Sequence, residues 1–245
     1  MARSRPSDRL REISIVTGFL DRSPSSVLYS MGSTTVLCTA SLQAGVPLFL
    51  EGRGKGWATA EYDMLPGSTA PRHARERGGK ISGRTQEIQR MIGRALRGIL
   101  DLGSLDRWTL QMDCDVLQAD GGTRTASING AYVAAAIATG IALRRGDLDR
   151  SPITDALGAV SAGIVRGKKL LDLDYGDDSA ADVDLNLVLT RGGAVLEIQA
   201  ASEGAAFSKE DLDELVALAR GGIARIIEEN VRAAERAVAA VVPSP

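Results

Sequence analysis

The sequence of 245 residues has little of what several common kinds of site require. It contains one histidine, His73, so a zinc site with the usual ligand spacing is excluded. His73 lies in an arginine-rich segment, where we expect a solvated side chain, and this leaves Ser-His-Asp catalysis with little support. The two cysteines, Cys38 and Cys114, each stand in an apolar alternating run. We therefore expect buried free thiols instead of a disulfide or a metal pair.

Long apolar runs and targeting signals are also missing. The most apolar stretch, residues 131–143, is short and rich in alanine, which argues against a bilayer span and a membrane partner. Residues 1–6 do not lead into an apolar segment with a cleavage site, so we expect no secretory signal and a cytoplasmic location. With 44% hydrophobic and 24% charged residues, the chain is long enough to bury a sizeable core as one large or two small packed units. Of these we expect a single globular domain over residues 1–245.

The charged residues are segregated along the chain. The net charge is only −2, so the overall charge does not indicate a nucleic-acid partner. Residues 72–97 nevertheless contain eight basic and two acidic residues, whereas residues 172–184 contain six aspartates and no basic residue. This polarity fits an enzyme that binds a polyanion with one surface and divalent cations with another. Solvated surfaces and coding bias toward arginine explain the same pattern, so composition alone leaves both readings open.

The apolar periodicity predicts an α+β fold. Alternating or apolar runs predict strands at residues 12–20, 26–31, 34–42, 108–115, 156–165, 169–172, 183–190 and 194–200, whereas residues 57–62 form a short segment that is not assigned to a strand. Helical spacing predicts helices from Ser82, from about Thr123 to Arg144, and from Ser208, which forms a capping-box pattern with Asp211. Strands and helices do not alternate strictly in this order, which favours an α+β sandwich over a doubly wound sheet.

Two of the predicted helices begin with the same pattern, Arg-Thr-x-x-Ile, at residues 84–88 and 124–128. The second follows Asp120-Gly-Gly122, and glycines there permit a tight turn whose exposed amides and helix dipole favour an anion. An arginine at a helix start is unfavourable unless an anion is bound, so Arg84 and Arg124 are candidate phosphate ligands. Neither a nucleotide P-loop nor a dinucleotide-binding glycine pattern occurs. An ordinary glycine turn with a surface arginine remains the alternative.

The aspartate-rich segment offers oxygen ligands for a metal. Period-two geometry places Asp182, Asp184 and Asn186 on one face of a predicted strand, with Asp177 and Asp178 just before it. Such oxygens suit Mg²⁺ or Mn²⁺, although a solvated edge strand is an equally common explanation. Together with the arginines, they fit a reaction in which a metal stabilises charge on a phosphodiester beside a bound anion. Whether that anion is a reactant or part of the substrate stays open at this point.

Four segments resemble the signature blocks of bacterial ribonuclease PH, in the same order along nearly the whole chain. They are Gly54-Lys-Gly-Trp-Ala-Thr-Ala-Glu-Tyr62, Ser82-Gly-Arg-Thr-Gln-Glu-Ile-Gln-Arg-Met-Ile-Gly-Arg-Ala-Leu-Arg97, Asp113-Cys-Asp-Val-Leu-Gln-Ala-Asp-Gly-Gly-Thr-Arg-Thr-Ala-Ser-Ile128 and Asp178-Ser-x-x-x-Val-Asp-x-Asn186. The resemblance implies the β-α-β-α sandwich of that family, a fold shared with a ribosomal small-subunit protein domain. It also implies a phosphorolytic 3′-to-5′ exoribonuclease, a nucleotidyltransferase that trims tRNA precursors with inorganic phosphate and releases nucleoside diphosphates.

The resemblance further implies roles for individual residues. The orthophosphate ligands would be Arg84, Gly122, Thr123 and Arg124. Asp178 and Asp184 would be the catalytic carboxylates linked to Mg²⁺ or Mn²⁺. The basic loop that guides the tRNA acceptor stem would contain Arg72, Arg75 and Arg77. The family assembles as a hexameric ring, a trimer of dimers, so a homo-oligomer is expected.

The sequence departs from the family pattern in two places, and both bear on the implied activity. The chain has Arg5-Pro-Ser-Asp-Arg9 where the family has Arg-Pro-Asp-Gly-Arg, and we expect a shortened N-terminus. It also has Gln199-Ala-Ala-Ser-Glu203 in place of Gln-Gly-Thr-Gly-Glu, so a need for positive φ would strain this loop beside the aspartates and lower activity. The alternatives are a catalytically weak or inactive ring subunit that binds RNA, and a hydrolytic nuclease. The presence of both arginines and both aspartates favours the phosphorolytic enzyme.

Overall fold

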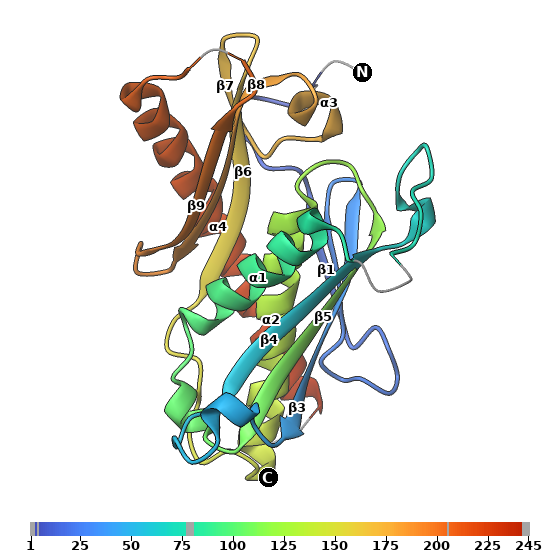
Figure 1. Cartoon of the computed structure of the whole chain (residues 1–245), viewed down its shortest axis with the longest axis vertical. Coiled ribbons are helices and arrows are strands. Elements are labelled where there is room, and N and C mark those ends of the chain that lie inside the picture. The colour runs from blue at the N-terminus through green and yellow to red at the C-terminus, as the bar shows by residue number, and fades with distance from the viewer. Residues whose placement is uncertain (1–2, 4, 77–80, 205, 242–245) are drawn as a thin grey trace.

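The computed structural model describes residue 3 and residues 5–76, 81–204 and 206–241. Figure 1 shows two β-sheets, one at each end of the view, with helices packed between and beside them. This arrangement confirms the predicted α+β class with mixed sheets packed against helices.

The first sheet contains five strands in the order β1-β2-β3-β5-β4. Their bounds are β1 Ile13–Thr17, β2 Val27–Met31, β3 Thr34–Ala44, β4 Trp57–Met64 and β5 Trp108–Gln118. All neighbours are antiparallel except β4 and β5, which run parallel. Alternate residues of β3 and β5 face the core, and Cys38 lies opposite Cys114 in the register of these two strands. Both cysteines are buried and free, as the sequence predicted.

The second sheet contains four antiparallel strands in the order β7-β6-β8-β9. Their bounds are β6 Leu157–Val165, β7 Lys168–Leu171, β8 Ala181–Thr190 and β9 Val195–Ser202. The last two residues of β9, which lie beyond the predicted strand, are extended and pair with β8, where Ala201 lies opposite Asp184. Among the described non-glycine residues, positive φ occurs at Arg166 and Asp172 alone. The strain expected from replacing glycines here is therefore not present.

Within the described residues there are also four α-helices and three short 3-10 helices. Their bounds are α1 Gly83–Arg97, α2 Thr123–Arg145, α3 Tyr175–Asp178, α4 Lys209–Val241, η1 Leu48–Leu50, η2 Pro66–Ser68 and η3 Leu102–Leu105. The Ser82 side chain accepts a hydrogen bond from the Thr85 amide and so caps α1. Ser208 and Asp211 form the predicted capping box before α4, because each side chain accepts a hydrogen bond from the other residue's amide. The four-residue α3 was not predicted.

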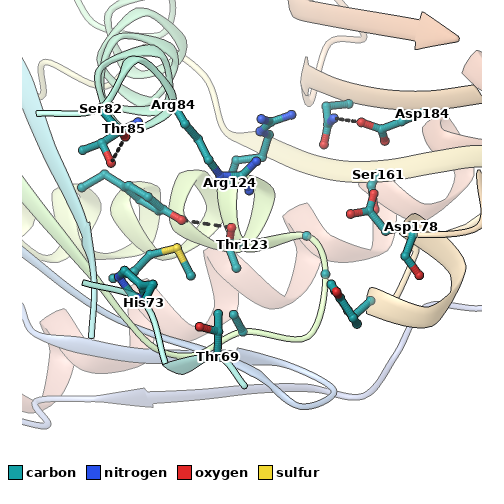
Figure 2. A pocket seen from close by; sticks show the side chains of 18 of the residues that line it. Thr69, His73, Ser82, Arg84, Thr85, Thr123, Arg124, Ser161, Asp178 and Asp184 are labelled. Atoms are coloured by element: carbon teal, nitrogen blue, oxygen red, sulfur yellow. Dashed lines mark hydrogen bonds between the residues drawn. The ribbon is translucent and has the colours of Figure 1, made fainter. Parts of the chain in front are cut away.

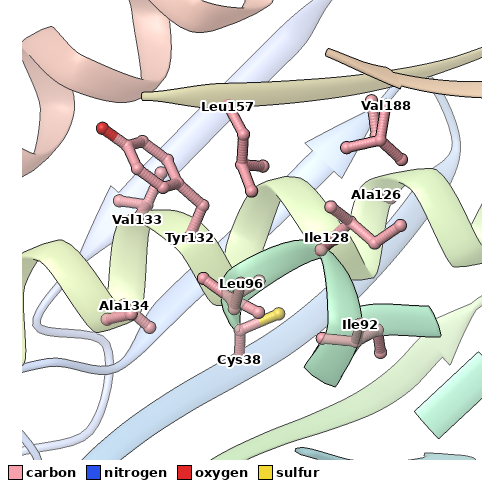
Figure 3. Close-up of a cluster of buried hydrophobic side chains, with 14 of the residues drawn as sticks. Cys38, Ile92, Leu96, Ala126, Ile128, Tyr132, Val133, Ala134, Leu157 and Val188 are labelled. Carbon is pink, nitrogen blue, oxygen red and sulfur yellow. The ribbon is translucent and has the colours of Figure 1, made fainter. Parts of the chain in front are cut away.

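Helix α2 is the central element and packs against both sheets and against α4. Figure 3 shows Leu157 and Val188 of the second sheet on one side of this helix and Cys38 of the first sheet on the other. By length and composition alone, α2 is long and apolar enough to cross a membrane, which differs from the expectation for residues 131–143. However, 78% of its most apolar 18-residue stretch is buried inside the protein. One cluster of buried apolar side chains includes residues from both sheets, α1, α2 and α4. The expectation of a single domain over residues 1–245 stays a prediction.

A candidate active site between the two sheets

A cavity of about 990 Å³ lies where the starts of α1 and α2 meet the second sheet (Figure 2). Six residues singled out in the sequence line it together: Arg84, Gly122, Thr123, Arg124, Asp178 and Asp184. They come from four separate elements that are distant in sequence. The fold thus brings the predicted phosphate ligands and the predicted carboxylates into one cavity.

The turn before α2 has the conformation that the glycine pair predicted. Gly121 and Gly122 have φ of +73° and +66°, which glycine adopts without strain. Gly122 is the N-cap residue and has no side chain with which to cap the helix. Thr123, the first helical residue, accepts a hydrogen bond of 3.0 Å from the Tyr62 hydroxyl. The start of α2 therefore faces the cavity with its positive dipole end and without a capping side chain.

The guanidinium group of Arg124 forms only long hydrogen bonds with its protein neighbours. Its Nη1 donates to Gln199 Oε1 at 3.3 Å, and its Nη2 donates to Glu87 Oε2 at 3.4 Å. Both distances are longer than those of a strong charge-assisted bond. The Nε atom is buried and has no hydrogen-bond partner within the described part of the chain. A guanidinium in this state retains donors for an anion in the cavity.

Arg84 is exposed and extends from the first turn of α1. Glu76 fixes this turn, because its carboxylate accepts hydrogen bonds from the Ser82 amide at 2.8 Å and from the Thr85 hydroxyl at 3.1 Å. The bonds from Ser82 and Thr85 hold the pKa of the Glu76 carboxyl below its usual value. Figure 2 shows the Arg84 and Arg124 side chains pointing into the same part of the cavity. Both arginines act electrostatically on Asp178 across it.

Asp184 is the more deeply buried of the two predicted catalytic carboxylates. Its Oδ2 accepts a hydrogen bond of 3.0 Å from the side-chain Nδ2 of Asn186. Its Oδ1 is buried and has no hydrogen-bond partner among the described residues. Burial, followed by repulsion from Asp178, raises the pKa of Asp184 to about 6, and the positive charge of Arg124 opposes this shift.

Asp178 ends the short helix α3 at the wall of the cavity. Partial burial of the carboxyl group raises its pKa, and the nearby charges of Arg124 and Arg84 counteract the rise. The Asp174 carboxylate caps α3 by accepting a hydrogen bond of 2.9 Å from the Asp177 amide. This cap explains how a segment so rich in aspartate forms a helical turn that holds Asp178 in place.

The two carboxylates fit a Mg²⁺ or Mn²⁺ ion that keeps much of its water. The buried Oδ1 of Asp184 is available as a ligand, and Asp178 lies close enough to raise its pKa. In the described ranges no group of three or more His, Cys, Asp or Glu side chains is arranged to hold a metal. Mg²⁺ commonly binds through one or two carboxylates together with waters and substrate phosphates, so a larger set is unnecessary.

Other residues of the aspartate-rich segment lie outside the cavity. Asp182, expected on the same face as Asp184, is exposed and does not line it. Asp177 is buried and accepts a hydrogen bond of 2.7 Å from Arg3, which makes it part of the scaffold. The strand periodicity was right for Asp184 and Asn186, while Asp182 lies near the start of β8, where the register with β6 shifts.

The basic loop lies beside the cavity. Arg72 and Arg75 are exposed and flank His73, which lines the cavity. The third residue predicted to guide RNA, Arg77, lies outside the described residues. The expectation of a solvated His73 is wrong, because the ring is half-buried and its Nδ1 is buried without a hydrogen-bond partner in the part of the chain that is described.

Several lining residues were not singled out as ligands from the sequence. They include Tyr62, Ser161, Tyr175, Gln199 and Glu203. Tyr62 and Gln199 could have been identified from the sequence, since each lies in a segment that was compared with the ribonuclease PH pattern. No sequence pattern identifies Ser161 and Tyr175, because only the folded chain brings β6 and α3 to the start of α2.

Comparison with known protein families gives matches over both halves of the chain. A sequence model described as "3′ exoribonuclease family, domain 1" matches residues 9–140, and the model of domain 2 of that family matches residues 155–222. Ribonuclease PH of Neisseria gonorrhoeae is 53% identical over 225 residues, which cover 91% of this chain and 93% of the relative. Ribonuclease PH of Rhodopirellula baltica is 50% identical over 228 residues, covering 91% and 93%.

Solved structures of the same fold are more distant in sequence. A chain of the Archaeoglobus fulgidus exosome with RNA bound to the active site has a TM-score of 0.77 and 23% identity, covering 92% of this chain and 90% of that one. Rice Rrp46 has a TM-score of 0.75 and 19% identity, covering 95% and 98%. At these identities the likeness establishes the fold alone.

Proposed function

Because the chain belongs to the 3′ exoribonuclease family and is an exoribonuclease of the ribonuclease PH type, we propose that it removes 3′-terminal nucleotides from tRNA precursors with inorganic phosphate. The products are nucleoside diphosphates and a shortened RNA. One observation carries the assignment of the site: Arg84 and Arg124, at the starts of two helices, share a cavity with Asp178 and Asp184.

Orthophosphate binds at the start of α2 in this mechanism. The amides of the first turn and the guanidinium groups of Arg84 and Arg124 surround the anion, and the unpartnered Nε of Arg124 supplies a further donor. These groups hold a phosphate oxygen in line with the bond to be broken, which replaces a bimolecular encounter by a positioned attack. The arginines also neutralise charge that gathers on the transferred phosphoryl group.

The carboxylates act at the other side of the scissile bond. Asp178 and Asp184 would hold Mg²⁺ or Mn²⁺, which supplies Lewis-acid stabilisation of the charge on the phosphodiester. An oxygen of orthophosphate forms a bond to the terminal phosphorus, and the bond from that phosphorus to the 3′ oxygen of the preceding nucleotide breaks. The leaving oxygen takes its proton from whichever of the two carboxyl groups does not coordinate the metal at that moment, and both have a raised pKa that suits this task.

The RNA approaches across the basic loop and the mouth of the cavity. Arg72 and Arg75 are exposed there and provide positive charge for the phosphates of an acceptor stem. The exosome neighbour with RNA bound to its active site supports RNA as the polymer, although only its fold is comparable. A cytoplasmic location goes with this role as a proposal.

The chain assembles into a ring of six copies in this proposal. Exosome chains share its fold, and apolar side chains including Phe49, Val195 and Ile198 are exposed on the single chain. Native mass spectrometry at micromolar concentration should give a mass of six chains, or of two if dimers are the stable unit. A single-chain mass at that concentration would contradict the ring.

Product identity tests the reaction directly. The protein is incubated with 3′-extended tRNA and Mg²⁺, with and without orthophosphate, and the released nucleotides are separated. Nucleoside diphosphates that appear only with phosphate are expected, and Asp184→Asn serves as the inactive control. Nucleoside monophosphates would indicate hydrolysis, and RNA binding without any product would indicate an inactive ring subunit.

A further inference from the structure

Arg11 is a buried arginine that lies outside the cavity, against the back of the phosphate turn. It precedes β1, and 8% of its surface is exposed. Its Nε and Nη2 donate to the two carboxylate oxygens of Asp172, at 3.1 Å and 2.7 Å. The Arg11 amide donates to the same carboxylate at 2.7 Å. A fully buried carboxylate thus holds the guanidinium in one orientation.

The remaining donors of Arg11 bind the backbone of the turn. Nη1 donates to the carbonyl of Asp120 at 2.6 Å, and Nη1 and Nη2 both approach the carbonyl of Gly121 at 3.4 Å. In a planar trans peptide the carbonyl and the following N–H point in opposite directions. Because these two carbonyls face Arg11, the amides of Gly121 and Gly122 point away from it. Both glycines line the cavity.

The turn is packed tightly against Arg11 and against the carboxylate segment. A Cβ atom on Gly122 would lie 2.9 Å from Arg11 Nη2, and one on Gly121 would lie 2.6 Å from the carbonyl carbon of Asp174. Asp174 caps α3, the helix that ends at Asp178. The backbone that presents phosphate-binding amides and the backbone that presents a catalytic carboxylate are therefore in direct contact around Arg11.

Asp172 is itself held in an uncommon conformation. Its φ is +57°, a region that a non-glycine residue occupies only when its surroundings fix it. Its amide donates to the Ser161 carbonyl at 2.7 Å, and its carbonyl accepts a hydrogen bond from the Arg5 guanidinium. Asp172 is thus anchored to the second sheet while it binds Arg11 at the edge of the first.

We propose that Arg11 is a positioning residue for phosphorolysis: clamped by Asp172, it turns the amides of the Asp120–Gly122 segment toward orthophosphate and keeps that segment in register with Asp178. This inference rests on the proposed function. Arg11 does not touch the substrate in this role, so its effect is on the affinity for orthophosphate and not on the affinity for RNA.

The test is Arg11→Lys, assayed as the full chain with 3′-extended tRNA and Mg²⁺. Lysine keeps the charge beside Asp172, but its single ammonium cannot bind the carboxylate in a fork and two backbone carbonyls at once. The KM for orthophosphate should rise about tenfold or more, as expected when a misplaced binding group weakens a charged ligand, with the KM for RNA nearly unchanged. Orthophosphate should also lose its stabilising effect on the melting temperature of the variant.

Tyr29→Phe is the matched control for loss of a buried polar contact. The Tyr29 hydroxyl donates to Asn230 Oδ1 at 2.9 Å in the core, away from the cavity. This variant should lower thermal stability and leave the KM for orthophosphate unchanged. The positioning role would be overturned if Arg11→Lys raised the KM for RNA as much as the KM for orthophosphate. It would also be overturned if Tyr29→Phe raised the KM for orthophosphate as much as Arg11→Lys does.

If Arg11→Lys does not fold, Thr34→Val provides the test of whether positioning of the turn controls the affinity for orthophosphate. The Thr34 hydroxyl donates to the Gly121 carbonyl at 2.6 Å and accepts from the Asp120 amide at 2.9 Å, so it holds the same turn. We expect a smaller rise in the KM for orthophosphate, and no rise would refute the inference. Wild-type protein that makes no diphosphates with phosphate present would instead refute the proposed function, which keeps the two failures distinct.

Discussion

At the scale of single residues, the candidate site contains polar atoms for which the described part of the chain provides no partner. Arg124 Nε and Asp184 Oδ1 are both buried and unpartnered among the described residues, and both residues line the cavity. A buried polar group without a hydrogen bond costs roughly 1–3 kcal/mol. A fold tolerates such atoms where a bound ligand forms the missing hydrogen bond or metal contact. Substitution of these two residues is therefore the most direct test of the site.

Replacing Arg124 by alanine should raise the phosphate requirement. Loss of a charge-assisted contact to orthophosphate is worth about 1.5–3 kcal/mol, or roughly 10-fold to 150-fold in the KM for phosphate. The affinity for RNA, measured without phosphate, should change little. Arg150→Ala is the control, because Arg150 is exposed and paired with Asp101 outside the cavity. If Arg124→Ala weakened RNA binding and kept the phosphate dependence, the assignment would be wrong.

Asp184 should make metal binding depend on pH. Burial raises its pKa to about 6, so the carboxyl group is ionised above that pH and protonated below it. Metal ligands must be deprotonated, and protons therefore compete with the cation as the pH falls. Titration with Mn²⁺ should show affinity decreasing between about pH 7.5 and about pH 5.5. Asp184→Asn should bind weakly at every pH, and an affinity that does not change with pH in the wild type would exclude this role.

At the scale of elements, α2 depends on small side chains to pass between the two sheets. A Cβ atom on Gly130 would lie 2.5 Å from Cys38 Sγ and 3.1 Å from Tyr29 Cβ. Both neighbours belong to the first sheet and have little freedom to move in a packed core. The glycine therefore sets how closely α2 approaches β2 and β3.

Gly130→Ala should destabilise the protein although alanine favours helices. The gain in helix propensity is about 1 kcal/mol, whereas overpacking a core costs about 1–3 kcal/mol, so we expect a net loss of up to about 2 kcal/mol. Gly221→Ala in α4 is the matched control, since a Cβ atom there meets nothing within 4 Å. It should raise stability slightly in the same urea unfolding experiment. Equal effects of the two substitutions would refute the packing argument.

The elements that the sequence predicted well are those whose stability comes from their own pattern. The apolar spacing of α1 and the alternation in β3 and β5 are repeated over several turns or residue pairs, and the structure has these elements at nearly the predicted bounds. The four-residue α3 has no such repeat and exists because Asp174 caps it and Arg3 binds Asp177. The contact of Arg3 with Asp177 joins residues 174 positions apart, so local patterns do not reveal it.

At the scale of the whole molecule, the site depends on contacts that cross between the two sheets. The sequence identified Arg84, Arg124, Asp178 and Asp184 through local patterns and a family resemblance. It gave no sign of Arg11, because the pairing with Asp172 spans 161 positions. Likewise, the exposure of His73 was judged from neighbouring arginines, while the cavity that buries its ring edge is formed by the folded chain.

The whole-molecule charge makes a final prediction about RNA binding. With a net charge of −2, overall attraction is absent, so the salt dependence should come from the basic loop. Each phosphate contact contributes about 0.7 to 0.9 to the slope of log affinity against log salt concentration, so Arg72→Ala with Arg75→Ala should flatten it by about 1.4 to 1.8. The measurement is tRNA binding without phosphate over a range of KCl. Arg150→Ala with Arg232→Ala removes the same charge from other exposed positions. A similar flattening in that control would mean that net charge, and not the loop beside the cavity, attracts the RNA.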